Sequence, residues 1–141
     1  MSITRGGLSR RKQFDWHFDA ISKKVRVKNE DDREHSYSVQ EIHFILGRLH
    51  KEFGNKYFPL ANNVEYLGDG TEKMGLGVII LQQADSNVSH AQGSSYLGVV
   101  LEECGYFTWN GKNRGIEWRL IETDFSLATI ESRLIRSSTK R

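Results

Sequence analysis

The chain has 141 residues, a formal net charge of +2, 38% hydrophobic residues and 27% charged residues, the composition of an ordinary globular domain. Its longest aliphatic run, residues 78–81, is far shorter than the roughly 18 residues that indicate a membrane span, and the first residues carry no apolar signal segment. The single cysteine excludes an internal disulfide. We therefore expect a cytoplasmic protein, or a nucleoid or nuclear one if it binds DNA, with no cofactor and no membrane partner.

The charge is concentrated at the ends of the chain. Residues 1–14 carry four basic and no acidic side chains, whereas residues 35–123 carry seven basic and ten acidic ones. We predict that residues 1–13 form a flexible basic arm whose Arg10, Arg11 and Lys12 contact phosphate. Residues 14–123 should form one α+β domain, and residues 124–141 a terminal helix with a polar tail.

Residues 14–28 fit two periodicities. Phe14, Trp16 and Phe18 alternate with polar residues, as in a strand with one wet face, although apolar residues also recur at helical spacing here. The aromatic content favours the strand. A second strand should follow over residues 24–28, and residues 29–35 should be a charged loop.

Capping signals predict the first helix. Ser38 and Glu41 form a capping box, apolar residues follow at helical spacing to residue 53, and Gly54 closes the segment. We expect residues 55–70 to be irregular, residues 71–83 to form a helix weakened by Gly75 and Gly77, and residues 124–136 to form the last helix.

A helix followed by a hairpin is predicted over residues 89–120. Ser89 and Gln92 form a second capping box, and the apolar face of the helix runs to Cys104. Two aromatic strands, residues 107–109 and 116–120, then flank a polar loop over residues 110–115. Trp109 and Trp118 should pack on the same face of this hairpin.

Three helices and a two-stranded wing resemble the winged helix-turn-helix superfamily. The residues that carry the resemblance are AQGSSYLGVVLEECGYF, at 91–107, and GIEWRL, at 115–120. The resemblance implies an α+β fold with a winged-helix core over residues 38–121, an N-terminal β element and a C-terminal helix. It also implies that the helix before the wing is the recognition helix.

This interpretation predicts a non-catalytic, sequence-preferring duplex DNA-binding protein, and its arms and terminal helix are compatible with a homodimer on a two-part site. The helix over residues 90–104 would enter the major groove, and the hairpin over residues 107–120 would contact the backbone. Glutamine, serine and alanine side chains can contact base edges, and basic side chains neutralise phosphate. The base-contacting candidates are His90, Ala91, Gln92, Ser94 and Ser95, and the backbone-contacting candidates are Lys112, Asn113, Arg114 and Arg119.

Acidic residues weigh against this interpretation. No lysine or arginine lies between Lys73 and Lys112, and Glu102 and Glu103 end the proposed recognition helix. The first alternative is therefore a winged helix that binds another protein. The second is a metal-dependent nuclease using Asp15 and Asp19, whose face we expect instead to pair with Lys24, Arg26 and Lys28.

Overall fold

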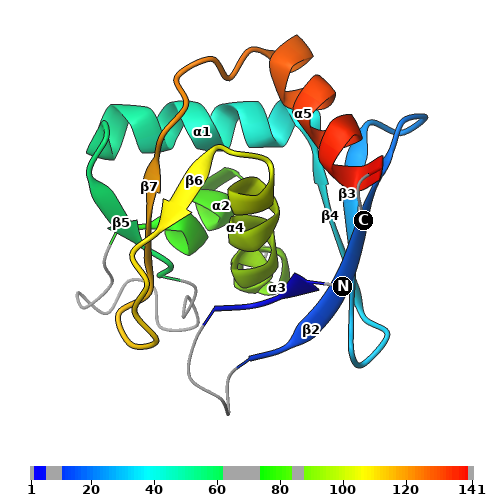
Figure 1. The fold of residues 1–141 in the computed structure, drawn as a ribbon, viewed down its shortest axis with the longest axis horizontal. Coiled ribbons are helices and arrows are strands. Elements are labelled where there is room, and N and C mark those ends of the chain that lie inside the picture. Colours follow the sequence, from blue (N-terminus) through cyan, green and yellow to red (C-terminus); the bar gives the residue numbers. More distant parts are fainter. Residues whose placement is uncertain (1, 6–10, 62–73, 84–87, 140–141) are drawn as a thin grey trace.

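The computed structural model describes residues 2–5, 11–61, 74–83 and 88–139, and within these ranges the chain is a mixed α+β protein with two antiparallel sheets (Figure 1). The strands are β1 (Ser2–Ile3), β2 (Gln13–Asp19), β3 (Lys24–Asn29), β4 (Glu34–Ser38), β5 (Tyr57–Pro59), β6 (Phe107–Trp109) and β7 (Glu117–Leu120). The helices are α1 (Val39–Phe53), α2 (Leu76–Gln83), α3 (Val88–Gln92), α4 (Ser94–Glu103) and α5 (Leu127–Thr139). No helix in the described ranges has the length and apolar character needed to cross a membrane.

The first sheet has the order β1-β2-β3-β4. Its buried face carries Phe14, Trp16, Val25, Val27 and Tyr37, because alternate residues of a strand point to the same side. The two strands predicted between residues 14 and 28 are confirmed, and the helical alternative is wrong.

Two predictions for this sheet need correction. Residues 34 and 35, expected at the end of a charged loop, instead begin β4, in which Tyr37 adds its ring to the buried face. The N-terminal arm is not free over its described residues, since Ser2 and Ile3 pair with Phe14 and Gln13.

Helix α1 follows its sequence signals. The Ser38 hydroxyl accepts a hydrogen bond of 3.0 Å from the backbone N–H of Glu41, and Gly54 ends the helix with a φ of 60°. The carboxylate of Glu41 lies 2.6 Å from His90 Nε2, so it links α1 to α3.

The hairpin belongs to a three-stranded sheet with the order β5-β7-β6. Trp109 pairs directly with Trp118, as predicted. Residues 57–59 were expected to be irregular, but they form β5 and place Phe58 in the core. The hairpin is therefore not a separate two-stranded wing.

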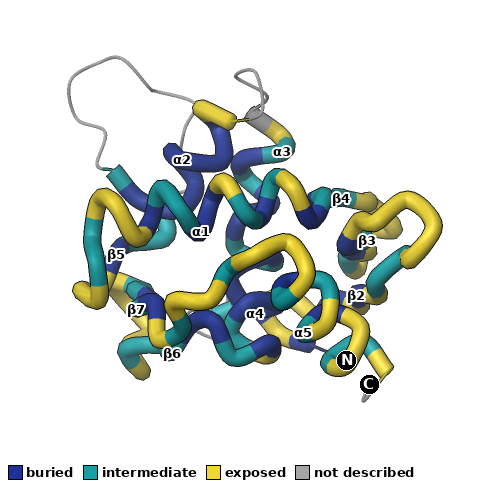
Figure 2. Tube along the Cα trace, turned by 90° about the horizontal axis from the view of Figure 1, so that it is seen from above, coloured by how far each residue is buried: buried dark blue, intermediate teal, exposed yellow. Residues whose placement is uncertain are grey.

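Helix α2 begins at Leu76, later than expected. The predicted start, residues 71–73, lies outside the described residues, and Met74 and Gly75 are not helical. Residues 76–81 are all buried, and the backbone N–H of Gly77 donates to Leu60 O at 2.7 Å. Figure 2 shows burial concentrated along α2 and α4 and exposure at the strand turns.

The predicted helix before the hairpin is two helices, α3 and α4, that meet at Gly93. A Cβ atom at Gly93 would contact the Tyr37 hydroxyl and lie 2.9 Å from His35 Nδ1, so β4 approaches this corner too closely for a larger residue. Ser89 lies inside α3, which begins at Val88, and so does not serve as its N-cap. Helix α4 lies between the two sheets (Figure 1).

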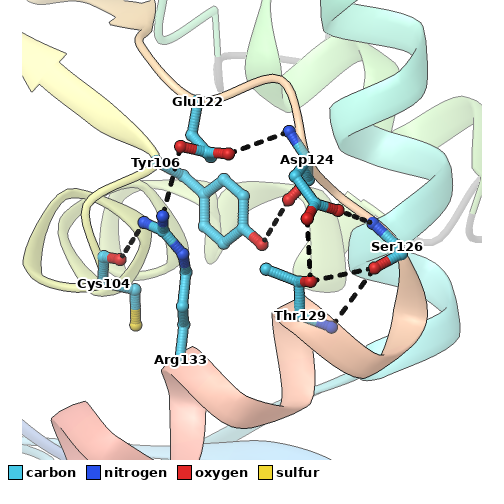
Figure 3. Close-up of polar contacts among 7 residues, drawn as sticks. All are labelled: Cys104, Tyr106, Glu122, Asp124, Ser126, Thr129 and Arg133. Carbon is cyan, nitrogen blue, oxygen red and sulfur yellow. Dashed lines mark hydrogen bonds and ion pairs between the residues drawn. The ribbon is translucent and has the colours of Figure 1, made fainter.

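The segment between β7 and α5 is held by a polar network (Figure 3). Ser126 Oγ accepts from the N–H of Thr129 at 3.3 Å, and Tyr106 donates to Asp124 O at 3.1 Å. Arg133 donates to Cys104 O at 3.1 Å and forms an ion pair of 3.2 Å with Glu122. These contacts attach α5 to the end of α4.

Candidate nucleic-acid interface

The helix face expected to read bases is largely covered. Ala91 and Ser94 have no exposed surface, and Val99 is 4% exposed. His90 packs its ring 4.5 Å from that of Tyr37 and holds Glu41. Ala91, Ser94 and Val99 therefore lack the solvent access that a contact with a base edge requires.

Gln92 and Ser95 remain partly exposed, but they face the protein's own β3–β4 hairpin. They line a cavity of about 630 Å³ together with residues from 29 to 35. A flat groove-contacting surface is therefore absent from the described part of α3 and α4, and these two side chains belong to a concave site.

Glu102 and Glu103, which the sequence interpretation treated as obstacles to DNA, both hold other parts of the fold. Glu103 accepts from Trp16 Nε1 at 3.2 Å and from Ser2 Oγ at 2.6 Å. Glu102 accepts from Trp118 Nε1 at 3.0 Å and forms an ion pair with Arg5. Glu102 is half-buried and its charge is balanced by Arg5, which reduces the repulsion it exerts on a polyanion, whereas Glu103 is exposed.

The N-terminal segment meets the hairpin tip. Thr4 and Lys12 exchange hydrogen bonds of 2.8 and 2.9 Å, and the guanidinium of Arg5 lies 4.1 Å from the centre of the Trp109 ring. A hollow of about 240 Å³ forms at this meeting point. The described residues around it are Ile3, Thr4, Arg5, Arg11, Trp109 and Asn113. Two basic segments about a hundred residues apart in sequence thus share one surface.

The hairpin tip presents its charges to solvent. Lys112, Asn113 and Arg114 are all exposed, and Asn110 Nδ2 fixes the loop by donating to Gly115 O at 2.9 Å. Gly111 and Gly115 have φ values of 80° and 65°, a region that favours glycine.

The remaining residues predicted to contact the DNA backbone do not all lie at the same place in the structure. Arg11 and Lys12 are exposed beside the hollow, whereas Arg10 lies outside the described residues. Arg119 lies apart from the tip, with its guanidinium 5.6 Å from the Tyr57 ring and its Nε without a hydrogen-bond partner among the described residues. The structure therefore separates Arg119 from the other basic candidates.

The acidic face of β2 is a charged surface. Hydrogen bonds from Ser22 and Arg26 lower the pKa of Asp19 to about 2, and Arg26 lies 3.1 Å from its carboxylate. Among the described residues, no three His, Cys, Asp or Glu side chains are placed to hold a metal ion. The expected cross-strand pairing with this face is confirmed for Arg26, and Lys28 lies 3.7 Å from Asp32.

Cys104 is buried directly after α4. Burial raises the pKa of its thiol to about 11, with a further contribution from Glu103. Little thiolate is present at neutral pH, and the residue is not suited to act as a nucleophile.

Comparison with known protein families, characterised proteins and solved structures finds no match for this chain.

Proposed function

We propose that this protein is a non-catalytic, winged-helix-type module that binds the backbone of duplex DNA through the surface where its N-terminal segment meets the β6–β7 hairpin. The observation that carries the proposal is the hollow bordered by Arg5, Arg11 and Asn113. Phosphate neutralisation by lysine and arginine supplies most non-specific DNA affinity.

The charges at this surface are suited to an external anion. Lys12, Lys112 and Arg114 are exposed and form no ion pair with any described residue. Arg5 is committed to Glu102 and Trp109, so it positions the segment and does not itself need to contact DNA. Binding phosphate therefore does not require these cations to give up an ion pair within the described part of the protein.

The helix order supports a modified version of the winged-helix interpretation. Helices precede the β6–β7 hairpin, as the resemblance implies, although the described residues form four of them in place of three and β5 lies between α1 and α2. Because Ala91 and Ser94 are buried, the hairpin and not the helix would carry the contact. We therefore expect little preference for base sequence.

The test is fluorescence anisotropy with two unrelated 20-base-pair duplexes over a range of salt concentrations. The variant Lys112→Ala/Arg114→Ala should weaken binding to both duplexes about tenfold and reduce the slope of log K against log salt by roughly 1.8, because each lost phosphate contact removes about 0.9. The matched control Lys51→Ala/Lys56→Ala removes two exposed lysines near the end of α1 and should retain the wild-type slope. Equal slopes for the two variants would contradict the proposal.

A protein partner is the second candidate, and one observation favours it. Phe44 on α1 is 51% exposed. The neighbouring residue His43 contacts the segment before α5, with its Nδ1 2.7 Å from Phe125 O. Leu127, two residues further along that segment, is 48% exposed. A protein interface buries such apolar residues. Sedimentation equilibrium tests a second copy as the partner: a dimer that Phe44→Glu dissociates would support this function, and a monomer at all concentrations would exclude homodimerisation.

A further inference from the structure

A second cavity lies away from the hairpin tip, between the β3–β4 hairpin and the corner where α3 meets α4. Its volume of about 630 Å³ is within the range of sites that hold small molecules. One wall comes from a sheet and the other from two helices, which places hydrogen-bonding side chains from separate elements around one space.

Part of the wall is aromatic. Tyr96 and His35 both line the cavity, with ring centres 5.5 Å apart and planes inclined by 31°. Phe14 packs edge-on against Tyr96 at 5.1 Å, and Asn29 Nδ2 donates to its hydroxyl at 3.3 Å. A fixed aromatic wall favours a ligand with a planar ring.

The imidazole in this wall is neutral at pH 7. Burial is the main cause that lowers the pKa of His35, and the charges of His90 and Arg33 lower it further. A neutral imidazole offers one donor and one acceptor and does not attract an anion.

The helical wall supplies uncharged polar groups. Ser89, Gln92 and Ser95 line it, and the serine hydroxyls can each donate and accept hydrogen bonds. Nucleobase edges present donors and acceptors side by side, which hydroxyl groups can match.

The charges around the cavity disfavour a phosphorylated ligand. Asp31 and Glu34 outnumber Arg33 among the described lining residues. Carboxylates repel phosphate but accept hydrogen bonds from sugar hydroxyls. An uncharged nucleoside satisfies this arrangement better than a nucleotide does.

The corner that forms the cavity is held tightly. Tyr37 donates to His90 O at 2.9 Å, and Gly93 leaves no room for a Cβ atom beside His35. The wall therefore needs little reorganisation on binding.

We propose that this cavity binds a nucleobase, in the form of an uncharged nucleoside. The inference is independent of the duplex-binding function, because it concerns different residues from those of the hairpin tip.

The experiment titrates the full chain with the four deoxynucleosides, their 5′-monophosphates, and ribose as a sugar-only probe, by isothermal calorimetry and ligand-observed NMR. At least one nucleoside should bind with a dissociation constant on the order of 0.1 mM, the value expected from roughly 0.3 kcal/mol per ligand heavy atom. Its monophosphate should bind no more tightly, and ribose should bind at least tenfold more weakly.

Two variants locate the site. Ser95→Leu fills the cavity and should abolish nucleoside binding, whereas the matched control Ser132→Leu, at an exposed serine of α5, should leave it unchanged. The milder Ser95→Ala should weaken binding about two- to tenfold, the value of one hydrogen bond, and it keeps the test valid if the leucine variant fails to fold. Lys112→Ala/Arg114→Ala should bind nucleosides like the wild type, which separates this inference from duplex binding.

The proposal is overturned if no nucleoside binds below about 1 mM, if ribose binds as well as the nucleosides, or if a monophosphate binds tenfold more tightly. It is also overturned if Ser95→Leu folds, as judged by circular dichroism, and retains wild-type nucleoside affinity.

Discussion

The two sheets hold α4 through neighbouring glutamates but with different kinds of partner. On the side of the four-stranded sheet, Glu103 accepts hydrogen bonds from the neutral donors of Trp16 and Ser2. On the side of the three-stranded sheet, Glu102 accepts from Trp118 and also pairs with the Arg5 guanidinium. The first attachment relies on neutral donors, whereas the second includes an ion pair that salt can weaken.

The N-terminal segment takes part in both attachments. Ser2 reaches Glu103, and three residues later Arg5 reaches Glu102 and the Trp109 ring. The segment therefore connects the two sheets across the end of α4, so variants at this point report on the two attachments separately.

The largest effect should come from closing the space between α4 and the three-stranded sheet. A Cβ atom at Gly98 would lie 2.5 Å from one atom and 2.8 Å from two others of the buried Trp118 ring. Gly98→Ala should lower the free energy of unfolding by about 2–3 kcal/mol, as overpacking of a core does. Urea denaturation measures this change.

Gly47→Ala is the matched control for that prediction. Its Cβ would lie 4.0 Å from Phe125, an ordinary contact, so the helix should gain about 0.5–1 kcal/mol from the loss of a glycine. If both variants change stability in the same direction, the close approach of α4 to Trp118 is wrong.

The second prediction compares the two glutamates directly. Glu102→Ala leaves the buried Trp118 N–H and the Arg5 charge without this acceptor and should cost about 2 kcal/mol, whereas Glu103→Ala should cost about 1 kcal/mol. Thermal denaturation at low and high salt tests the difference. Glu102→Gln, which retains an acceptor but no charge, should match the wild type more closely at high salt than at low salt, and equal salt dependence of all three variants would contradict the comparison.

A smaller effect should appear as a pH dependence at the other end of α4. The pKa of His35 is lowered by burial in the folded state, so the unfolded chain binds more protons as pH falls below its ordinary value of 6.5. His35 therefore contributes to stability above pH 6.5, and this contribution is lost as the pH falls. The free energy of unfolding should be lower at pH 5 than at pH 7. His35→Phe should reduce this slope, and the exposed His17→Gln should retain it.

The smallest effect concerns Cys104, which directly follows the two glutamates. Because burial raises its thiol pKa to about 11, a thiol reagent at pH 7.5 should label the native protein very slowly and the urea-unfolded protein rapidly. Glu102→Ala should accelerate labelling more than Glu103→Ala. Fast labelling of the wild type would show that the end of α4 is accessible.

Local signals predicted the parts of the fold that a single element can specify. The Ser38 cap and the apolar periodicity were sufficient for α1, and the alternation of Phe14 and Trp16 with polar residues was sufficient for β2. The direct pairing of Trp109 with Trp118 also followed from the two strands of one hairpin. These features depend on contacts between residues close in sequence.

Strands β4 and β5 were missed because their local sequence is ambiguous. Residues 34–38 contain one large apolar residue, Tyr37, and β5 is three residues long and includes Pro59. Both strands exist because a neighbouring strand offers them backbone partners, which a local pattern does not reveal.

The candidate interface was predicted in part. The basic character of the N-terminal segment and the hairpin tip is visible in the sequence, but their meeting at one hollow depends on the pairing of β1 with β2 and on the reach of Arg5 to Glu102. The sequence indicated that Gln92 and Ser95 lie on a polar helix face, but it did not indicate that this face lines a cavity.

The sequence by itself determined where α1, the first two long strands and the hairpin form, because capping, alternation and turn residues act over a few positions. Only the tertiary structure decided which face of α4 meets water. A helical wheel assumes one buried side, but α4 lies between two sheets: Ser94 has no exposed surface, and Gly98 is a position where the Trp118 ring of β7 leaves no room for a Cβ atom.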